Sequence, residues 1–386
     1  MSSGIYLFNP TAEMAVANGV FSYQPPELLR IFEKDMAAVM LYFAGKDDVV
    51  LVNKVPDTNF LKHVASIKSD LPSFMTMDEL LHCDRTFERL VPWGWSPVID
   101  KLVENLSPVL SDDFYKAPSN GWDDQYKTYY NRMTAGDVLS QLYSQKADIL
   151  ADYNRIRPEP CYNASQVQDL LSQNGSIVVK APFSSSGRGL QMLRRKELNK
   201  SNTEWINSIL NKQHFVMAEK LHHKIADFSL HFKLTPTEFP EYLGIVCFET
   251  NSNGQFKGCY LQKHPNPQIQ HLIDTFLSGA RISAYCGALK QWYPNYTGFL
   301  GIDAMVIKEN EQLSVHPLVE INPRFTMGLL TIRLRNYVNY DGSWSMLFDK
   351  KANLQDKLHH DMIALTPLFA DTKFAAILSP HDQNPD

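Results

Sequence analysis

Short apolar runs and one helical pattern organise the first third of the chain. Ile5–Phe8 and Val49–Val52 are the apolar runs, and residues 26–44 between them have helical spacing of apolar positions. Asn9-Pro10 closes the first run, as turn residues commonly do at the end of a strand. The order strand, helix, strand predicts a parallel βαβ unit. We therefore expect residues 1–115 to form a small α/β domain.

A second α/β pattern begins after a polar, turn-rich segment at 117–124 and a helical stretch at 135–153. Its expected elements are a helix at 165–172, strands at 176–180 and 190–193, a helix at 203–210 and a strand at 215–218. Strands are predicted beyond it at 228–234, 242–250, 257–262, 299–307 and 313–321, with one helix at 270–289. The predicted segments are an N-terminal domain (1–115), a linker and helical segment (116–154), a small subdomain (155–218) and a strand-rich C-terminal subdomain (219–386).

The composition fits a globular protein with more than one core. The chain has 386 residues, of which 44% are hydrophobic and 20% charged. A net charge of −5 and a pI of about 6.2 give no electrostatic basis for binding nucleic acid or an anionic membrane. No apolar run approaches the roughly 18 residues of a transmembrane helix, and the N-terminus lacks the basic region of a signal peptide. We expect a cytoplasmic protein; its oligomeric state is open.

The cysteines and histidines do not form recognisable metal motifs. Five cysteines are present, an odd number, and none are spaced as CxxC, which favours reduced thiols over disulfides or a zinc site. The pairs His222-His223 and His359-His360 lack suitably spaced carboxylate or cysteine partners. Surface positions are therefore expected for these histidines.

The strongest candidate for chemistry is the run Glu320-Ile321-Asn322-Pro323-Arg324. Side chains alternate along a strand, so Glu320 and Asn322 share one face. Two hard oxygen ligands in this arrangement suit Mg²⁺ bound to a polyphosphate, and Arg324 follows as a candidate anion-binding group. Taken alone, the run is equally compatible with a surface salt bridge.

Asp303 lies one predicted hairpin upstream, in the strand 299–307. Simple antiparallel counting places it opposite Pro317, three residues from Glu320, which is roughly 10 Å and too far to share one ion. A bulge at His316-Pro317 would shorten this distance, and proline within strands occurs mainly at edges and bulges. Asp303 is thus a metal ligand only if the hairpin contains that bulge.

A lysine at a strand end followed by a glycine- and serine-rich turn forms a second constellation. Lys180 precedes the turn Ser184-Ser185-Ser186-Gly187-Arg188-Gly189, whose backbone N–H groups and hydroxyls could hold phosphates. The turn is neither a Walker A loop nor GxGxxG. A plain hairpin with a glycine-rich turn explains the segment equally well.

A third constellation follows the apolar strand 215–218. The backbone around Glu219-Lys220-Leu221 could bond a purine edge, and Asp227 could accept from ribose hydroxyls. Lys233, farther along, could reach a phosphate. In isolation, solvated acids at strand ends and an exposed lysine are the simpler interpretation.

In this order and spacing, the three constellations resemble the ATP-grasp superfamily, which includes D-alanine–D-alanine ligase, glutathione synthetase and the biotin-dependent carboxylases. The resemblance covers about residues 130–340, and its best parts are 177–190, 216–227 and 298–328. It implies an α/β (α+β) fold, with an ATP-grasp unit preceded by a small α/β domain. The stretch 264–295 matches no particular member, which leaves the acceptor site open.

The resemblance also implies roles for residues. ATP would lie between the small subdomain and the C-terminal sheet, with Lys180 and the turn 184–189 on its phosphates. Glu219, Lys220 and Leu221 would meet the adenine, and Asp227 the ribose. Asp303, Glu320 and Asn322 match positions that bind Mg²⁺, with Mn²⁺ as an alternative, and Arg324 matches an arginine that steadies the transferred phosphate.

The resemblance finally implies a reaction class. A small-molecule carboxylate would attack the γ-phosphate of ATP, and an amine or similar nucleophile would displace phosphate from the resulting acyl phosphate. A peptide or protein acceptor is compatible with the same chemistry. Two alternatives remain: a kinase of the same fold, and a non-catalytic nucleotide-binding protein.

Overall fold

The computed structural model describes residues 3–117, 121–143, 150–184, 189–252, 254–339, 341–350, 353–359 and 362–380. The chain divides into two compact units. The first comprises residues 1–123, 257–263 and 324–386, and the second comprises 124–256 and 264–323. Residues 324–386 thus cluster with the N-terminal residues, whereas the sequence pattern groups them with 219–323.

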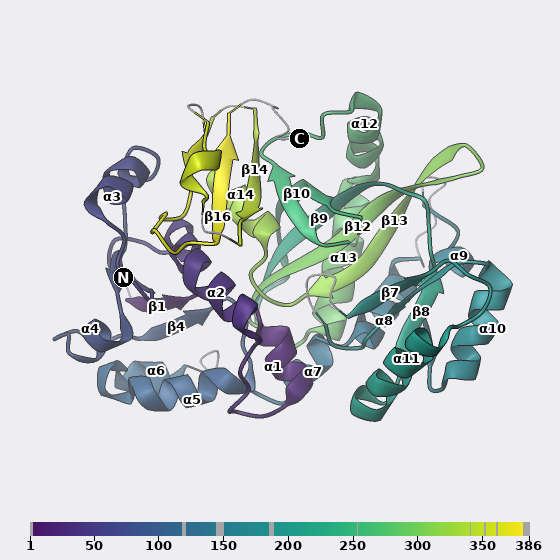
Figure 1. The fold of residues 1–386 in the computed structure, drawn as a ribbon, viewed down its shortest axis with the longest axis horizontal. Coiled ribbons are helices and arrows are strands. Elements are labelled where there is room, and N and C mark those ends of the chain that lie inside the picture. The colour runs from purple at the N-terminus through teal and green to yellow at the C-terminus, as the bar shows by residue number, and fades with distance from the viewer. Residues whose placement is uncertain are drawn as a thin grey trace. The chain divides into compact units, whose positions relative to one another are not determined.

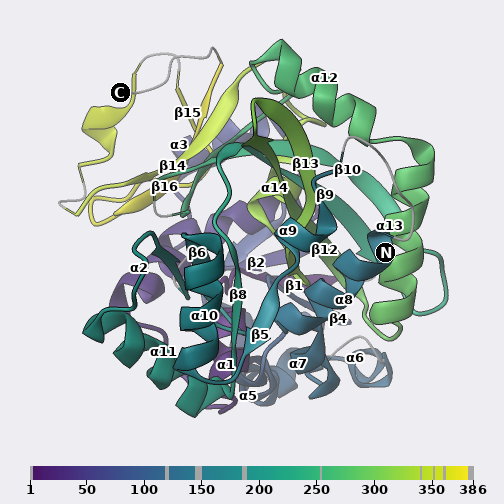
Figure 2. The ribbon, with the colours of Figure 1, turned by 90° about the vertical axis from the view of Figure 1, so that its right-hand side faces the viewer.

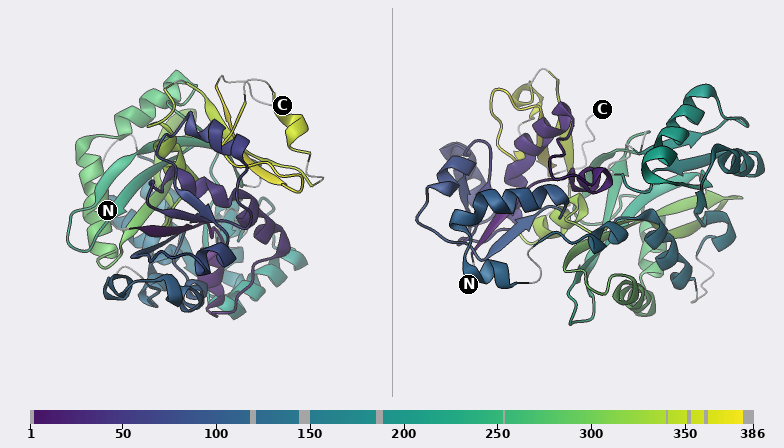
Figure 3. Two further views of the ribbon diagram at one scale, coloured as in Figure 1. Left: turned by 90° about the vertical axis from the view of Figure 1, so that its left-hand side faces the viewer. Right: turned by 90° about the horizontal axis from the view of Figure 1, so that it is seen from below.

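The first unit contains a four-stranded parallel sheet with the order β3-β2-β1-β4 (Figures 1 and 3). Its elements are β1 (Gly4–Leu7), α1 (Ala12–Asn18), α2 (Glu27–Met36), the 3-10 helix η1 (Ala37–Tyr42), β2 (Val49–Leu51), α3 (Thr58–Ala65), β3 (Ser73–Met75), α4 (Met77–Leu81), β4 (Arg89–Pro92), α5 (Pro97–Leu106), η2 (Ser107–Val109) and α6 (Asp112–Lys116). Ile5 and Val49 are fully buried, as expected for parallel strands covered on both faces. The predicted βαβ unit is present.

The first unit also contains antiparallel strands from the C-terminal part of the chain. These elements are β11 (Phe256–Tyr260), α14 (Met327–Leu334), β14 (Ser343–Phe348), η3 (Gln355–Lys357), β15 (Ile363–Ala364) and β16 (Phe374–Ser379). β14 pairs with β11 and β16, and β15 pairs with β16. The buried carboxylate of Asp35 on α2 accepts the backbone N–H groups of Lys373 and Phe374 at 2.8 and 3.1 Å. This carboxylate fastens β16 to the N-terminal helix.

A small antiparallel sheet with the order β5-β8-β6-β7 opens the second unit. Its elements are β5 (Glu159–Cys161), α10 (Ala164–Asn174), β6 (Ile177–Lys180), β7 (Leu190–Leu193), α11 (Lys200–Gln213) and β8 (Val216–Lys220). α10 and α11 lie side by side over this sheet (Figure 2), and Val167, Leu171 and Ile206 pack against Ile177 and Val179 in one core. The helices begin at Asn163 and Asn199, whose side chains cap their first turns.

A second, larger antiparallel arrangement with the order β13-β12-β9-β10 completes this unit. Its elements are α7 (Gln125–Tyr129), α8 (Arg132–Leu142), α9 (Tyr153–Ile156), β9 (Lys224–Leu234), β10 (Glu241–Thr250), α12 (Pro267–Phe276), α13 (Gly279–Trp292), β12 (Gly298–Glu309) and β13 (Gln312–Asn322). α8 and α13 are held together by bonds from Arg281 to the carbonyl of Leu142 and from Trp292 to Gln141. α8 also contacts β13 and α13 contacts β10, so this helix pair packs against the strands.

The single helix predicted at 270–289 is wrong. Two helices are present, because Ser278 accepts a hydrogen bond from the backbone N–H of Arg281 and so begins a new helix after Phe276. Among the described residues, no helix is long and apolar enough to cross a membrane. The five cysteines are free thiols, and all but Cys83 are buried.

Candidate functional site

The hairpin of β12 and β13 brings Asp303 and Glu320 together. The register pairs Asp303 with Glu320 and Met305 with His316, so three residues of β13 lie opposite one residue of β12. This irregularity is the bulge on which the assignment of Asp303 depends, and the simple count that placed Asp303 opposite Pro317 is wrong. The hydroxyl of Tyr285 on α13 donates to the carbonyl of Pro317 at 2.5 Å and so holds the bulge. Directly opposed residues have Cβ atoms about 5 Å apart, close enough to share an ion.

The oxygen atoms at this point of the hairpin fit a hard divalent cation. Asn322 donates its amide N–H to Asp303 at 3.0 Å, which brings the amide of Asn322 beside the carboxylate pair. Carboxylate and amide oxygens are the ligand types that Mg²⁺ takes in proteins. Among the described residues, no group of three or more His, Cys, Asp or Glu side chains is arranged to hold a metal ion. The candidate set therefore consists of two carboxylates and one amide, fewer than the six oxygens of a Mg²⁺ ion, so a bound ion would need further oxygens from a ligand or water.

Arg132 is a site residue that the sequence analysis missed. Its guanidinium lies 2.7 Å from Oε1 of Glu320 and also donates to the carbonyl of Ala181 and the hydroxyl of Ser184, at 2.9 and 3.1 Å. The Arg132 side chain is 10% exposed, so this ion pair is not the surface salt bridge that the sequence allowed. Arg132 thus connects the end of β6 and the following turn to the carboxylate of β13. Arg132 lies just before the helical stretch predicted at 135–153, and nothing in its local sequence signals this role.

Lys180 is buried and forms an ion pair with Glu219. Both side chains are less than 10% exposed, and β6 and β8 hold them on neighbouring strands of the small sheet. Glu219 is therefore not the solvated acid that the simpler interpretation required. In a buried setting, the two opposite charges compensate each other.

The glycine-rich turn is described only at its ends. Ser185, Ser186, Gly187 and Arg188 lie outside the described residues. At Gly189, a Cβ atom would come within 2.1 Å of the Cβ of Ser184, so only glycine fits beside that residue. The carbonyl of Gly189 also accepts the backbone N–H of Ala181 at 2.7 Å, which closes the base of the turn.

Two buried histidines adjoin the Lys180–Glu219 pair. Neither ring nitrogen of His316 has a hydrogen-bond partner among the described residues, and this side chain is almost fully buried. His222 is also buried, with Nδ1 3.4 Å from Oε1 of Glu309, so the expected surface position of His222 is wrong. Glu309 in turn accepts a bond from Lys220 at 2.8 Å. Burial, followed by the charge of Lys180, holds the pKa of His316 well below its ordinary value.

His316 should make the stability of the protein depend on pH. Its folded pKa is depressed, so an unfolded chain binds a proton here below about pH 6.5 while the folded chain does not. We expect the free energy of unfolding to fall on acidification by up to about 1.4 kcal/mol per pH unit from this residue. His316→Leu should flatten this slope in urea unfolding between pH 7.5 and 5.5. His82→Gln, at a histidine whose side chain is 76% exposed, is the control; an unchanged slope in His316→Leu would contradict the account.

The remaining candidates for binding the nucleotide differ in their surroundings. They are Leu221, Asp227 and Lys233. Asp227 accepts bonds from Lys224 and from the hydroxyl of Thr250 at 2.5 and 2.9 Å, and burial raises its pKa. The N–H of Leu221 donates to the carbonyl of Ser176 at 3.1 Å and is therefore engaged within the protein. Lys233 is exposed near the end of β9. On the same strand, the hydroxyl of Ser229, which lies opposite Asp303, is 2.9 Å from Nε2 of His231.

Arg324 begins the last segment of the first unit and forms a buried ion pair there. Its Nε donates to Oε1 of Glu13 at 2.9 Å, and Nη1 donates to the carbonyl of Phe325 at 3.0 Å. The Arg324 and Glu13 side chains are 12% and 5% exposed. Glu13, in the first turn of α1, therefore fixes the guanidinium that the sequence proposed as an anion-binding group.

No family model and no curated protein sequence matches the chain. Solved structures do match it over almost its full length. An N5-carboxyaminoimidazole synthetase from Staphylococcus aureus aligns with 99% of this chain and 94% of its own, at a TM-score of 0.51 and 13% identity. A biotin carboxylase from Campylobacter jejuni in an ATP complex aligns with 99% of this chain and 87% of its own, at 0.51 and 9% identity.

A third match is the biotin carboxylase domain of the 2-oxoglutarate carboxylase from Hydrogenobacter thermophilus. It aligns with 98% of this chain and 86% of its own, at a TM-score of 0.50 and 10% identity, and its structure contains MgADP, ADP and bicarbonate. These similarities confirm the expected fold. The chain has the ATP-grasp fold, preceded by an α/β domain with a parallel sheet.

Proposed function

We propose that the protein is an ATP-dependent ligase that joins a carboxylate to an amine, or to a similar nucleophile, through an acyl phosphate. The observation that carries this proposal is the network centred on Arg132. It connects the phosphate-binding candidates at the end of β6 to the carboxylate pair of the β12–β13 hairpin, within one compact unit. ATP and Mg²⁺ are the proposed cofactors, with Mn²⁺ as an alternative ion.

The fold comparisons support this proposal through what the matched structures contain. The carboxylase domain from Hydrogenobacter thermophilus holds a magnesium nucleotide and bicarbonate, a small oxyacid. The site described above contains side chains of the classes that bind phosphate groups and Mg²⁺. Lys180 and Arg132 are cations for phosphate oxygens, and Asp303, Glu320 and Asn322 are oxygen ligands for a divalent ion.

The residues would act by binding and by neutralising charge. A carboxylate oxygen attacks the γ-phosphorus, the bond to the bridging oxygen breaks and ADP leaves. The amine nitrogen then attacks the acyl carbon, phosphate leaves and the nitrogen loses a proton. Lys180 and Arg132 would neutralise the phosphate oxygens as charge moves, and a divalent ion held by Asp303, Glu320 and Asn322 would supply further positive charge. No side-chain nucleophile is required.

The proposal also includes the substrates, the partners and the cellular location. Small-molecule carboxylates and amines are the proposed substrates, and a peptide or protein amine fits the chemistry equally. We do not propose nucleic acid or membranes as partners, because a protein with a net charge of −5 has no overall electrostatic attraction to these anionic surfaces. Five free thiols support a reducing, cytoplasmic location.

The decisive experiment measures ADP release from purified protein with Mg²⁺-ATP and pools of carboxylic acids and amines, followed by mass spectrometry. The proposal requires a product whose mass equals acid plus amine minus water. A stable phosphorylated acceptor with no condensed product would establish a kinase instead. Nucleotide binding with no ADP release across all pools would establish a binding protein.

Lys180→Ala should raise the ATP concentration that gives half-maximal activity by at least about tenfold, because hydrogen bonds to charged groups contribute about 1.5–3 kcal/mol. The control is Lys200→Ala, at the start of helix α11, which packs against the same small sheet; the Lys200 side chain is 91% exposed. Initial rates against ATP concentration provide the measurement. An unchanged ATP requirement in Lys180→Ala would remove Lys180 from the site.

A further inference from the structure

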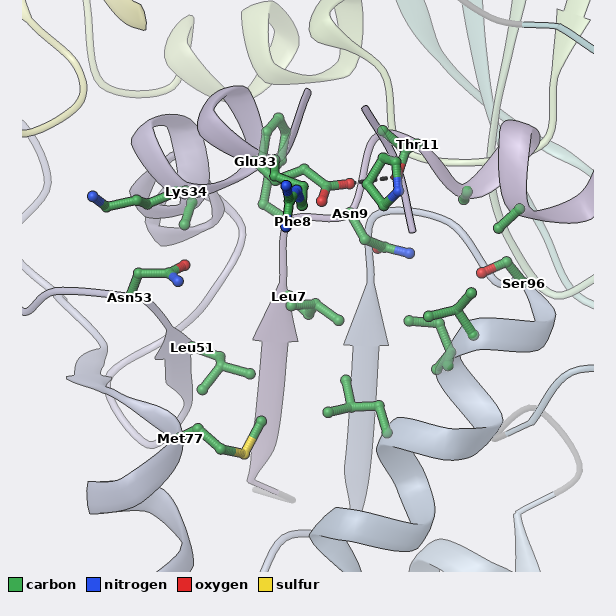
Figure 4. Close-up of a pocket in the computed structure, with 18 of the residues that line it drawn as sticks. Leu7, Phe8, Asn9, Thr11, Glu33, Lys34, Leu51, Asn53, Met77 and Ser96 are labelled. Atoms are coloured by element: carbon green, nitrogen blue, oxygen red, sulfur yellow. Dashed lines mark hydrogen bonds between the residues drawn. The ribbon is translucent and has the colours of Figure 1, made fainter. Parts of the chain in front are cut away.

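The first unit contains a cavity at the carboxyl ends of its parallel strands. Its volume is about 630 Å³, within the range of small-molecule sites. Leu7 ends β1, Leu51 ends β2 and Ser96 follows β4, and all three line the cavity (Figure 4). Carboxyl ends of parallel strands are where α/β proteins commonly bind ligands. The cavity lies entirely within the first unit and shares no residue with the site described above.

One side of the cavity suits an anion. Ser96 is the N-cap of the ten-residue helix α5, yet its side chain makes no capping hydrogen bond, and the residue is 1% exposed. Its hydroxyl points into the cavity (Figure 4). The N-terminus of a helix carries partial positive charge, which favours a carboxylate. Asn9 fixes the preceding loop by exchanging hydrogen bonds with the backbone of Gly94 at 2.7 and 3.3 Å.

Another side of the cavity suits a cation. Glu33 on α2 points into it and accepts a bond from the hydroxyl of Thr11 at 2.5 Å (Figure 4). Burial raises the pKa of Glu33, and no positive group is among the causes that act on it. Lys34, the next residue, forms its ion pair with Asp371 instead, at 2.8 Å. Arg30, on the same helix, also lines the cavity but is not among the groups that act on Glu33. An ammonium group on a ligand would therefore meet a carboxylate that no lysine or arginine of the described residues neutralises.

The floor between these two sides is apolar. Leu7, Leu51 and Met77 lie below Glu33 and Ser96 in the view of Figure 4, and Ile99 and Leu102 of α5 also line the cavity. A ligand that bridges both polar sides must bury an apolar segment against these side chains. Each buried CH₂ group contributes roughly 0.8 kcal/mol, so the floor should select for length.

We propose that this cavity binds an aminocarboxylate in which an apolar body separates an ammonium group from a carboxylate. An ω-amino acid or a short apolar peptide has this form. The carboxylate meets Ser96 and the start of α5, the ammonium group meets Glu33, and the apolar body lies on Leu7, Leu51 and Met77. That this aminocarboxylate is a substrate of the ligase rests on the proposed function. That the cavity binds it does not depend on the proposed function.

The test uses the full chain without nucleotide, so that it stands apart from turnover. Calorimetric titrations compare 6-aminohexanoate and Leu-Leu with hexanoate, which lacks the amine, hexylamine, which lacks the carboxylate, and inorganic phosphate. We expect 6-aminohexanoate to bind at least about tenfold more tightly than either single-charge analogue, and glycine to bind more weakly than longer ω-amino acids. Tighter binding of phosphate than of hexanoate, or no binding by any probe, would overturn the proposal.

Two variants locate the charges. Ser96→Ala should weaken hexanoate and 6-aminohexanoate about tenfold and leave hexylamine unchanged. Glu33→Gln should weaken hexylamine and 6-aminohexanoate and leave hexanoate unchanged. Ser111→Ala is the matched control, because Ser111 is also an N-cap without a side-chain capping bond and does not line the cavity. Equal loss of all three probes in either variant would overturn the assignment. Binding as expected together with no ADP release for any substrate would overturn the ligase alone.

Discussion

Replacing Glu320 with glutamine is expected to reduce ATP consumption by about 10²–10³-fold while the protein remains folded. Glutamine keeps the size of the side chain and an oxygen acceptor for Arg132, which lies 2.7 Å away in the wild type. It removes the negative charge that, with Asp303, would hold a divalent ion. Loss of one preorganised electrostatic contact in an active site commonly costs about 2.7–4 kcal/mol of transition-state stabilisation.

The measurement is the rate of ADP release by Glu320→Gln, with circular dichroism and a thermal scan to establish the fold. Glu311→Gln is the matched control, since Glu311 lies at the turn of the same hairpin, pairs with Lys308 and is 89% exposed. It should retain wild-type activity. Near-normal turnover by Glu320→Gln would remove the hairpin from the chemistry, and comparable losses in both variants would point to the hairpin fold instead.

Replacing Glu13 with alanine is expected to lower the free energy of unfolding by about 3–5 kcal/mol, because it leaves the buried guanidinium of Arg324 without its carboxylate. Urea unfolding at pH 7 provides the measurement. The residues come from α1 and from the segment that precedes α14, so the pair also fastens the C-terminal segment to the N-terminal domain.

An exposed ion pair provides the comparison for Glu13→Ala. Asp113 and Lys116 lie 3.0 Å apart with side chains 71% and 73% exposed, and Asp113→Asn should change stability by less than about 1 kcal/mol. If Glu13→Ala has no greater effect than Asp113→Asn, the Glu13–Arg324 pair does not fasten the C-terminal segment.

Elements with a strong local pattern of apolar residues could be predicted from the sequence. Strands that form only by pairing with residues distant in the chain could not. The βαβ start and the β12–β13 hairpin follow from local patterns, and the resemblance to ATP-grasp proteins supplied the fold that joins them. The strands 343–348 and 374–379 were not predicted. Their place in the first unit depends on pairing with each other and on contacts such as that of Asp35, none of which is visible locally.

The same reason explains the errors within the site. Arg132 meets Glu320 across a large sequence separation, so neither residue predicts the other. His222 looked like a surface histidine because the residues beside its ring, Glu309 and His316, are far from it in the sequence. The register of Asp303 depended on a bulge whose presence Pro317 suggested but whose length only the pairing of the strands reveals.

That bulge also determines which insertions and deletions the β12–β13 hairpin can accept without losing the Asp303–Glu320 pair. It adds an even number of residues to β13 relative to β12, so His316 and Glu320 both keep the same facing as their partners, Met305 and Asp303. Deleting one residue between them would reverse the orientation of every side chain on one side of the deletion. Deleting two would restore a regular ladder with the orientation intact. Insertions and deletions compatible with the carboxylate pair should therefore occur in steps of two.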